Sequence, residues 1–198
     1  MKRYLEQQAF DRVSRDFTFL FRAIRKSHGE LDFRLRDGYF NLYYKGNSLA
    51  KVTIRKDEYL VSIHRKFATE KVFRGDDRFK GLDEPRGNYI EYRLNPDLLH
   101  PFFQKKHLDR LGRNIAKVKS SEEIIFEQML ITDNMEREDF FIIDRQVSET
   151  AMKRRKLDLL ALRQKQNNQF HFFVIEVKLG NNPELRSEVG NQLRGYVD

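Results

Sequence analysis

The sequence contains no cysteine and no tryptophan among its 198 residues. Without cysteine, the chain has no disulfide bond and no cysteine-ligated zinc site. It lacks an apolar run near the roughly 20 residues that cross a bilayer, and its N-terminus lacks the apolar core of a signal peptide. Its five histidines are scattered without metal-ligand spacing, and it has no internal repeat or low-complexity tract. We therefore expect a cytoplasmic protein without a membrane partner.

Composition and charge indicate a folded protein with two differently charged parts. Hydrophobic residues make up 39% of the chain and aromatic residues 13%, which is enough for a packed core. Residues 1–118 contain 26 Lys and Arg against 16 Asp and Glu, whereas residues 119–198 contain 12 against 14. We expect two domains with this boundary. A basic accessory domain suits an enzyme that gathers a polyanion, although a merely soluble basic domain has the same charge.

The first domain is expected to contain a helix, an antiparallel meander and a second helix. Apolar residues share one face of a helix over 3–27, and a basic helix is expected over 96–118. Residues 74–88 are rich in Gly, Asp and Arg and predict a long loop. Four alternating apolar runs separated by turn residues predict strands over residues 31–35, 39–44, 49–54 and 59–63. Substrate recognition, homodimer formation and binding of a protein partner all stay open for this domain.

Two carboxylates of the second domain lie in apolar surroundings, where an unpaired acid is costly to bury. Asp158 lies in the apolar run 157–162, and Glu176 directly follows the run 172–175. The continuous apolar character of 172–175 predicts a central strand that is buried on both faces. The polar stretch 163–169 between the two runs suits a hairpin connection.

Glu176-Val177-Lys178 is the only place where a lysine follows an acid by two residues. Alternation along a strand places the Glu176 and Lys178 side chains on one side. Two carboxylates and an ammonium at one edge predict a phosphodiester-cleaving metal site. Asp158 and Glu176 would bind Mg²⁺ or Mn²⁺, with the Val177 carbonyl as a further ligand. Lys178 would orient or deprotonate the attacking water or stabilise the transition state; otherwise it forms a salt bridge to one of the two acids.

Polar features flank these two strands. Residues 179–183 break the second strand, with Asn182 as the N-cap of a helix on which Gln192 and Tyr196 share one face. Four consecutive cations before Asp158 either hold flanking phosphates or keep a strand edge from pairing with another molecule. These cations are Lys153, Arg154, Arg155 and Lys156.

The order of Asp158, the Glu-x-Lys triplet and the Gln192–Tyr196 pair resembles the PD-(D/E)XK nuclease superfamily, in its branch with a Q-x-x-x-Y helix. The resemblance covers residues 119–198 and implies a restriction-endonuclease-like αβββα core in a chain of mixed α+β class. It implies a Mg²⁺-dependent deoxyribonuclease, with DNA favoured over RNA. It also implies that Gln192 and Tyr196 hold the nucleic-acid strand, or the active-site lysine and the metal-bound water. By pattern alone, Tyr196 is a packing residue.

The family pattern includes an acid on a helix ahead of the first core strand. Residues 120–130 predict this helix, with a serine as its cap and with Glu123 and Glu127 on one face. We prefer Glu123 because Phe126 and Leu130 follow it at three and seven residues, which places it at the edge of an apolar stripe. Each of the two glutamates is otherwise a solvated helix acid.

Two further expectations concern completeness and rival functions. Nuclease cores of this type usually continue with another strand or helix, so we expect the core to be truncated at its C-terminus. A catalytically idle nuclease fold that binds nucleic acid or a protein partner is the alternative function. A third hypothesis is an interaction protein in which the first domain is the active part.

Overall fold

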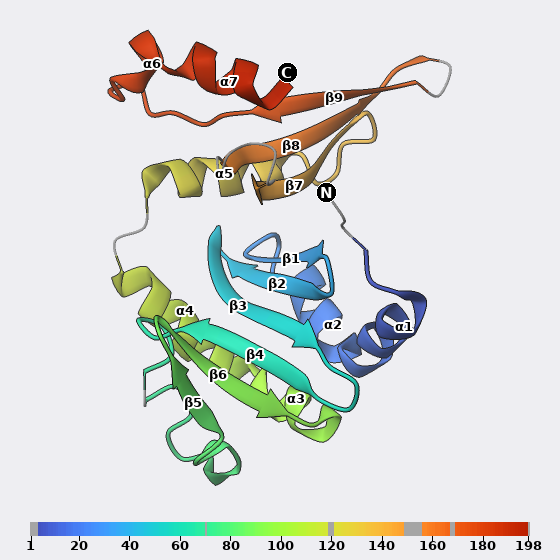
Figure 1. The fold of residues 1–198 in the computed structure, drawn as a ribbon, viewed down its shortest axis with the longest axis vertical. Helices are drawn as coiled ribbons and strands as arrows, with labels where there is room; N and C mark the ends of the chain where they lie inside the picture. Colours follow the sequence, from blue (N-terminus) through green and yellow to red (C-terminus); the bar gives the residue numbers. More distant parts are fainter. Residues whose placement is uncertain (1–3, 70, 119–120, 149–155, 167–168, 198) are drawn as a thin grey trace. The chain divides into compact units, whose positions relative to one another are not determined.

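The computed structural model describes residues 4–69, 71–118, 121–148, 156–166 and 169–197. The chain divides into two compact units, Lys2–Ser120 and Ser121–Asp198, here called the N-terminal and C-terminal units (Figure 1). Helices accompany one antiparallel sheet in each unit, so the expected mixed α+β class is confirmed. The boundary between the units lies two residues from the expected one.

The N-terminal unit is built on a six-stranded antiparallel sheet with the strand order β1-β2-β3-β4-β6-β5. All four predicted strands of the meander are present, and β5 and β6 extend the sheet. The strands are β1 (Leu31–Arg36), β2 (Tyr39–Tyr44), β3 (Asn47–Ile54), β4 (Tyr59–His64), β5 (Asp83–Arg86) and β6 (Tyr89–Leu94). The helices are α1 (Gln7–Asp16), α2 (Thr18–Lys26), the short 3₁₀ helix η1 (Asp77–Phe79), α3 (Pro96–Phe102) and α4 (Lys105–Lys117).

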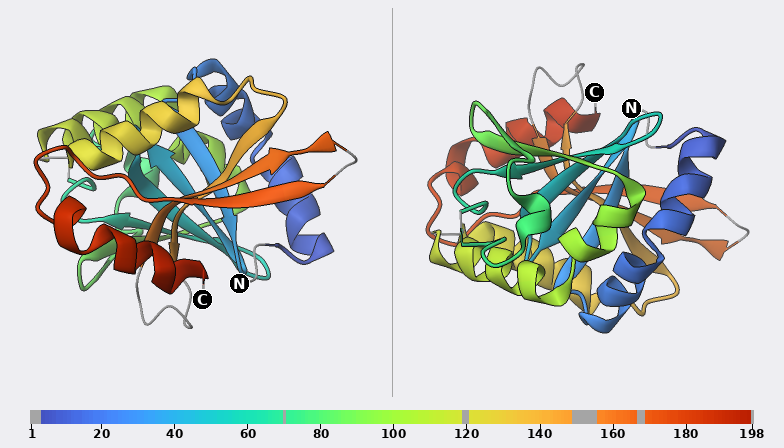
Figure 2. Two further views of the ribbon diagram at one scale, coloured as in Figure 1. Left: turned by 90° about the horizontal axis from the view of Figure 1, so that it is seen from above. Right: turned by 90° about the horizontal axis from the view of Figure 1, so that it is seen from below.

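The helices of this unit cover one face of its sheet (Figure 2). Its buried apolar side chains come from these helices and from the sheet and form one core. Phe17, which separates α1 from α2, is fully buried at the centre. Its ring meets Phe40 and Tyr59 edge-on, with centroids 5.0 and 5.1 Å away. Edge-to-face contacts of this kind add to the free energy gained by burying the rings. The alternation of buried and polar positions along β2 and β4 leaves the other face of the sheet polar.

The single helix predicted over 3–27 was wrong, because two helices meet at Phe17. Phe17 leaves helical geometry with φ −110° and ψ 18°. The Thr18 hydroxyl donates to the carbonyls of Ser14 and Arg15, at 3.0 and 2.9 Å, which helps to satisfy the open end of α1. The break places Phe17 in the core. Its position depends on tertiary packing, which the periodicity of the sequence does not predict.

Two other predictions for this unit need correction. The long loop expected over 74–88 contains η1 and the edge strand β5, whose Pro85 is tolerated because an edge strand needs fewer backbone donors. The helix expected over 96–118 is two helices, since Gln104 adopts extended backbone between α3 and α4. At 13 residues, α4 is the longest helix described, and within the described ranges no helix has the length and apolar character to cross a membrane.

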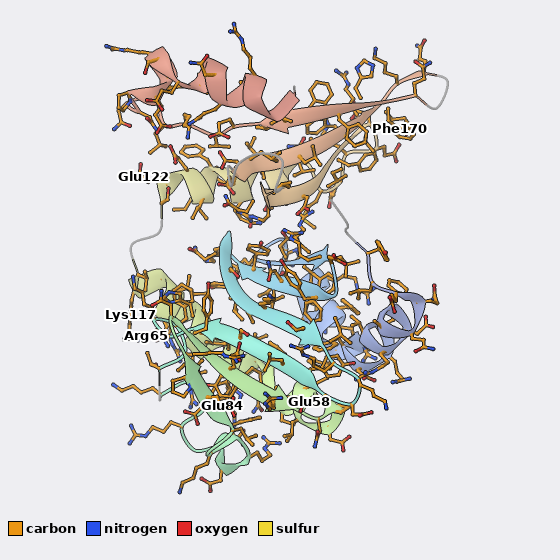
Figure 3. All side chains as sticks on the ribbon, viewed as in Figure 1. Glu58, Arg65, Glu84, Lys117, Glu122 and Phe170 are labelled. Carbon is orange, nitrogen blue, oxygen red and sulfur yellow. The ribbon has the colours of Figure 1, made fainter. Side chains whose placement is uncertain are left out.

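The C-terminal unit contains a three-stranded antiparallel sheet with the order β7-β8-β9. Its elements are α5 (Glu122–Asp133), β7 (Phe140–Ser148), β8 (Lys156–Gln164), β9 (Phe170–Ile175), α6 (Glu184–Ser187) and α7 (Val189–Val197). Figure 3 marks Glu122 at the start of α5 and Phe170 at the start of β9. The order of one helix, three strands and a helical segment is the order expected for this region.

The prediction that 172–175 forms a buried central strand was wrong. β8 is the central strand, and β9 pairs with β8 alone among the described residues. Phe172 is 69% exposed and Phe173 is 39% exposed. The apolar run correctly predicted a strand here but did not predict its exposure. Aromatic residues favour strands whether or not a second layer covers them.

Candidate active site

Asp158 of β8 lies beside the end of β9. The β8–β9 pairing ends with Leu159 opposite Ile175, so Glu176, Val177 and Lys178 follow β9 and are not part of it, contrary to the prediction that one strand carries them. The Val177 amide donates a hydrogen bond of 2.8 Å to Asp158 Oδ2, which fixes the Asp158 carboxylate beside the Glu-x-Lys triplet. The structure therefore joins residues that are 18 positions apart in the sequence.

Burial raises the pKa of Asp158 from its ordinary value of 3.8 to about 6. The hydrogen bond from the Val177 amide opposes this shift, while the negative charges of Glu176 and Glu127 add to it. Lys178 opposes it more weakly. Asp158 and Glu176 therefore share a half-buried region where their charges repel, and a divalent cation would relieve that repulsion.

Lys178 bridges two carboxylates. Its ammonium lies 2.9 Å from Glu176 Oε1 and 3.0 Å from Glu184 Oε2. The side chains of Glu176 and Lys178 are only 5% and 12% exposed. Burial alone would lower the pKa of Lys178, but the hydrogen bonds to Glu176 and Glu184 outweigh it and raise the pKa above its ordinary value. The salt bridge to Glu176 was one of the predicted alternatives, and it holds Lys178 in the protonated form.

Glu184 is a site residue that the sequence analysis missed. It begins α6, whose N-cap residue is Pro183 and not Asn182 as predicted. Asn182 precedes the cap, and its Oδ1 accepts a hydrogen bond of 3.0 Å from the Glu184 amide. The hydrogen bond from Lys178 lowers the pKa of Glu184. The only signal for Glu184 in the sequence is its place directly after the Asn182-Pro183 helix start, which brings the first turn back toward the strand.

The predicted Gln192–Tyr196 pair lies on α7. Gln192 Nε2 donates to Glu184 Oε2 at 3.5 Å, so Gln192 joins the Lys178 network at its outer side. Gln192 Oε1 is buried and accepts no hydrogen bond within the described residues. Such an orphaned acceptor is costly and can receive a donor from a bound ligand. Tyr196 falls on α7 one turn after Gln192, and its side chain lies outside the described part of the chain.

Of the two candidate helix acids, Glu127 is the buried one. It accepts hydrogen bonds from Arg145 at 3.0 Å and from Gln146 at 3.0 and 3.1 Å. Burial raises its pKa, while these donors oppose the shift. Its charge also acts on Asp158, which places it near the site. Glu123 accepts one hydrogen bond of 3.1 Å from Asn182.

The reason for preferring Glu123 was wrong. Phe126 and Leu130, the supposed apolar stripe, are 49% and 38% exposed, whereas the buried face of α5 carries Glu127, Gln128 and Ile131. Its helix also starts at Glu122 after Ser121, and the expected serine cap makes no side-chain hydrogen bond.

A buried polar network supports Glu127, and no motif or spacing in the sequence predicts it. Arg145 of β7 is fully buried, and donates to Gln128 Oε1 at 2.7 Å as well as to Glu127. Gln146 adopts a left-handed backbone with φ 49°, which is uncommon for a residue with a side chain. The β7–β8 register is the same at Arg145 and at Val147, so the left-handed backbone and not a register shift distinguishes Gln146, whose side chain donates to Glu127.

Three of the four predicted phosphate-binding cations, Lys153, Arg154 and Arg155, lie outside the described residues. Lys156 begins β8, and its side chain also lies outside them. Val177, predicted as a ligand through its carbonyl, contributes its amide to Asp158.

The two carboxylates suit a hard cation. Within the described residues, no group of three acidic or histidine side chains is assembled around a common point. Mg²⁺ commonly takes only one or two protein carboxylates and completes its shell with waters and substrate phosphate. Asp158 and Glu176, whose charges repel each other, meet that requirement.

No protein-family model, curated protein or solved structure matches this chain.

Proposed function

We propose that this protein is a metal-dependent nuclease of the PD-(D/E)XK type that hydrolyses phosphodiester bonds in DNA. One observation carries the proposal: Asp158 of β8 and Glu176 and Lys178, which follow β9, form one connected cluster through the Val177 amide and the Lys178 ion pair. Clusters of perturbed carboxylates beside a lysine are common at functional sites.

Each residue has a role that follows from its contacts. Asp158 and Glu176 would hold Mg²⁺ or Mn²⁺, which lowers the pKa of bound water and offsets charge on the scissile phosphate. Lys178 remains protonated between Glu176 and Glu184. It therefore supplies positive charge to the phosphate and does not accept the water proton. Gln192 steadies Glu184, and Glu127 fixes the helix side of the site through Arg145.

Charge supports a nucleic-acid substrate. The C-terminal part is slightly acidic, whereas residues 1–118 carry ten more basic than acidic residues. Basic surface binds polyanions through release of counterions, and the clustered acids remain for the metal. DNA rather than RNA follows from the family resemblance, and a cytoplasmic location belongs to the same proposal.

Cleavage of labelled single- and double-stranded DNA, with Mg²⁺, Mn²⁺ or EDTA, tests the proposal. Wild type is compared with Glu176→Gln and Lys178→Met. Glu138→Gln and Lys165→Met are matched controls. Both residues are exposed, and these substitutions remove the same charges from the same unit as the site variants do. We expect metal-dependent cutting that falls at least about a hundredfold in the two site variants.

A second readout separates metal binding from catalysis. Mn²⁺ titration followed by calorimetry should give a site in wild type that is lost in Glu176→Gln and kept in Lys178→Met. If the protein binds metal but cuts no DNA or RNA, the nuclease proposal is wrong and a binding function is favoured. Equal cutting by site and control variants would mean that the activity lies elsewhere.

A further inference from the structure

The face of the N-terminal sheet opposite its helices is hollowed. The hollow has a volume of about 700 Å³ and is formed by residues of the N-terminal unit alone. Its floor is made by outward-facing side chains of β2, β3, β4 and β6, here called the polar sheet face: Tyr39, Asn41, Lys51, Ser62, His64 and Tyr89. None of these residues has a role in the nuclease site.

Strand register aligns these side chains in rows across the sheet. Asn41 lies opposite Lys51, and Lys51 opposite Ser62. In a neighbouring row, His64 lies opposite Tyr89. Adjacent strands are about 4.8 Å apart and residues rise about 3.4 Å along a strand, so the backbone positions of Lys51, His64 and Tyr89 lie within about 12 Å of one another. The arrangement places a cation beside aromatic rings on one face of the sheet.

Two lysines at this face have no acidic partner. Lys51 and Lys66 are exposed, and neither forms an ion pair within the described residues. Glu91, the acid that lines the hollow, is already engaged, since it accepts hydrogen bonds from Ser62 at 3.3 Å and from Arg86 at 3.2 Å. Glu84 lies opposite Glu91 on β5, so two acids stand against Lys51, Lys66 and Arg86. The face therefore presents net positive charge to solvent.

Four aromatic side chains line the hollow: Tyr39, His64, Phe67 and Tyr89. Tyr89 is 49% exposed, and the ring of His64 lies edge-on to it with centroids 5.4 Å apart. Tyr39 is half-buried, and the Lys51 ammonium lies 4.2 Å from its ring centroid. Isolated exposed rings are ordinary, but rings between unpaired cations form a stacking platform for bases.

We propose that the polar sheet face binds single-stranded nucleic acid, with Lys51 and Lys66 on phosphates and Tyr89 stacked on a base. An acidic protein surface would satisfy the lysines, but it would not use the exposed ring. Duplex DNA hides its base faces, so a single strand suits the rings. The inference goes beyond the nuclease site, and the choice of DNA as the probe rests on the proposed function.

Binding of a fluorescent single-stranded oligonucleotide to the full chain in EDTA tests this inference without cleavage. The variants are Lys51→Ala/Lys66→Ala, Tyr89→Ala and Tyr89→Phe. Lys56→Ala/Lys80→Ala is the matched control, because both lysines are exposed in the same unit and away from the polar sheet face. All substituted side chains are at the surface, and circular dichroism checks that each variant folds.

The lysine and tyrosine variants should differ in the salt dependence of binding as well as in affinity. Lys51→Ala/Lys66→Ala should weaken binding roughly tenfold and reduce the salt dependence, log K against log salt, by about 1.4, since each single-strand phosphate contact contributes about 0.7. Tyr89→Ala should weaken binding between about fivefold and a hundredfold with the salt slope unchanged. Tyr89→Phe should keep the affinity because it keeps the ring.

Three results would overturn the inference. The first is equal affinity in all variants, and the second is an equal loss in the Lys56/Lys80 control. The third is loss in the lysine variant alone with full competition by polyglutamate, which would assign the face to an acidic protein. DNA binding of this pattern without cleavage under any metal would sink the nuclease and leave this inference standing. Cleavage with unchanged binding in the variants would do the reverse.

Discussion

The two units of this chain use their buried volume differently. In the N-terminal unit, buried apolar side chains from all four α-helices and the sheet form one continuous core around Phe17. In the C-terminal unit, the buried apolar residues are few among those described: Ile131, Val147, Leu157, Leu159 and Ala161. The same unit buries polar and charged residues, namely Glu127, Gln128, Asp144 and Arg145.

The buried residues of the N-terminal unit mainly stabilise its fold, whereas those of the C-terminal unit mainly support its polar cluster. Buried apolar area stabilises a fold directly, whereas buried ion pairs rarely gain more than they lose through desolvation. The C-terminal unit also leaves large apolar side chains exposed on α5 and on the sheet, among them Ile125, Met129, Phe141 and Phe172. A unit that buries Arg145 and exposes Phe172 is arranged around its polar cluster. The following predictions test that contrast.

The largest expected effect is a matched pair of phenylalanine truncations. Phe17→Ala should destabilise the N-terminal unit by about 4 kcal/mol, because a fully buried ring leaves a cavity among Phe40, Tyr59 and Phe103. Phe172→Ala, at a position 69% exposed, should change the free energy of unfolding by less than about 0.5 kcal/mol. Urea unfolding with hydrogen exchange assigns each change to its unit. Similar losses from both variants would erase the contrast.

Breaking the buried ion pair comes next. Arg145→Met should destabilise the C-terminal unit by about 3 kcal/mol, since Glu127 then stays buried with only Gln146 as its donor. The double variant Arg145→Met/Glu127→Gln should recover much of this loss, because it removes the uncompensated charge. Hydrogen exchange of β8 amides provides the measurement. A double variant as unstable as the single one would mean that Arg145 acts through shape and not through charge.

Much of the fold was predictable because local patterns decided it. The four strands of the N-terminal meander follow from alternation and turn residues, and their observed bounds differ from the predicted ones by at most two residues. The breaks at Phe17 and Gln104 were not predictable, since each depends on what the chain packs against. β5 was missed because Pro85 and its charged neighbours conceal an edge strand.

The candidate site was predicted in part. Asp158, Glu176 and Lys178 were selected from their apolar context, and the Val177 amide and the Lys178 ion pair connect them where β9 ends beside β8. Glu184 and Arg145 were missed because neither has a spacing that marks it; each enters the site through tertiary folding. The choice between the helix acids failed because apolar periodicity identified exposed residues of α5 as its packed face.

The charged carboxylate of Asp158 should lower the free energy of unfolding of the C-terminal unit at neutral pH. Its pKa is higher in the folded chain, about 6 against 3.8, so the folded state binds more protons in that interval. Stability contributed by this group therefore rises as pH falls from 6 to 3.8, and the charged form costs stability above 6. Asp158→Asn should stabilise the unit at pH 8 by about 1 to 2 kcal/mol, a value discounted for solvent screening of a half-buried group.

The same variant supplies its own control through pH and metal. At pH 5 the gain from Asp158→Asn should be smaller, because most of the wild-type carboxyl is then protonated. Mg²⁺ should stabilise wild type at pH 8 and leave Asp158→Asn unchanged, as a ligand that binds only the folded state requires. Hydrogen exchange of β8 amides, which reports the free energy of unfolding, measures the effect of pH and the effect of Mg²⁺. A gain from Asp158→Asn that is independent of pH would show that the carboxylate charge is not its origin.

Glu184 should have the smallest effect, because it shares Lys178 with a more buried partner. Glu176 is 5% exposed and Glu184 is 38% exposed, so solvent already screens the outer ion pair. Glu184→Gln should lower cleavage only severalfold, against at least a hundredfold for Glu176→Gln. Removing one carboxylate lowers the pKa of Lys178, so the alkaline limb of the pH–rate profile should move to lower pH. Glu188→Gln, an exposed neighbour, serves as the control. An unmoved alkaline limb would show that Glu176 alone keeps Lys178 protonated, and Glu184 would then belong to the helix cap and not to the site.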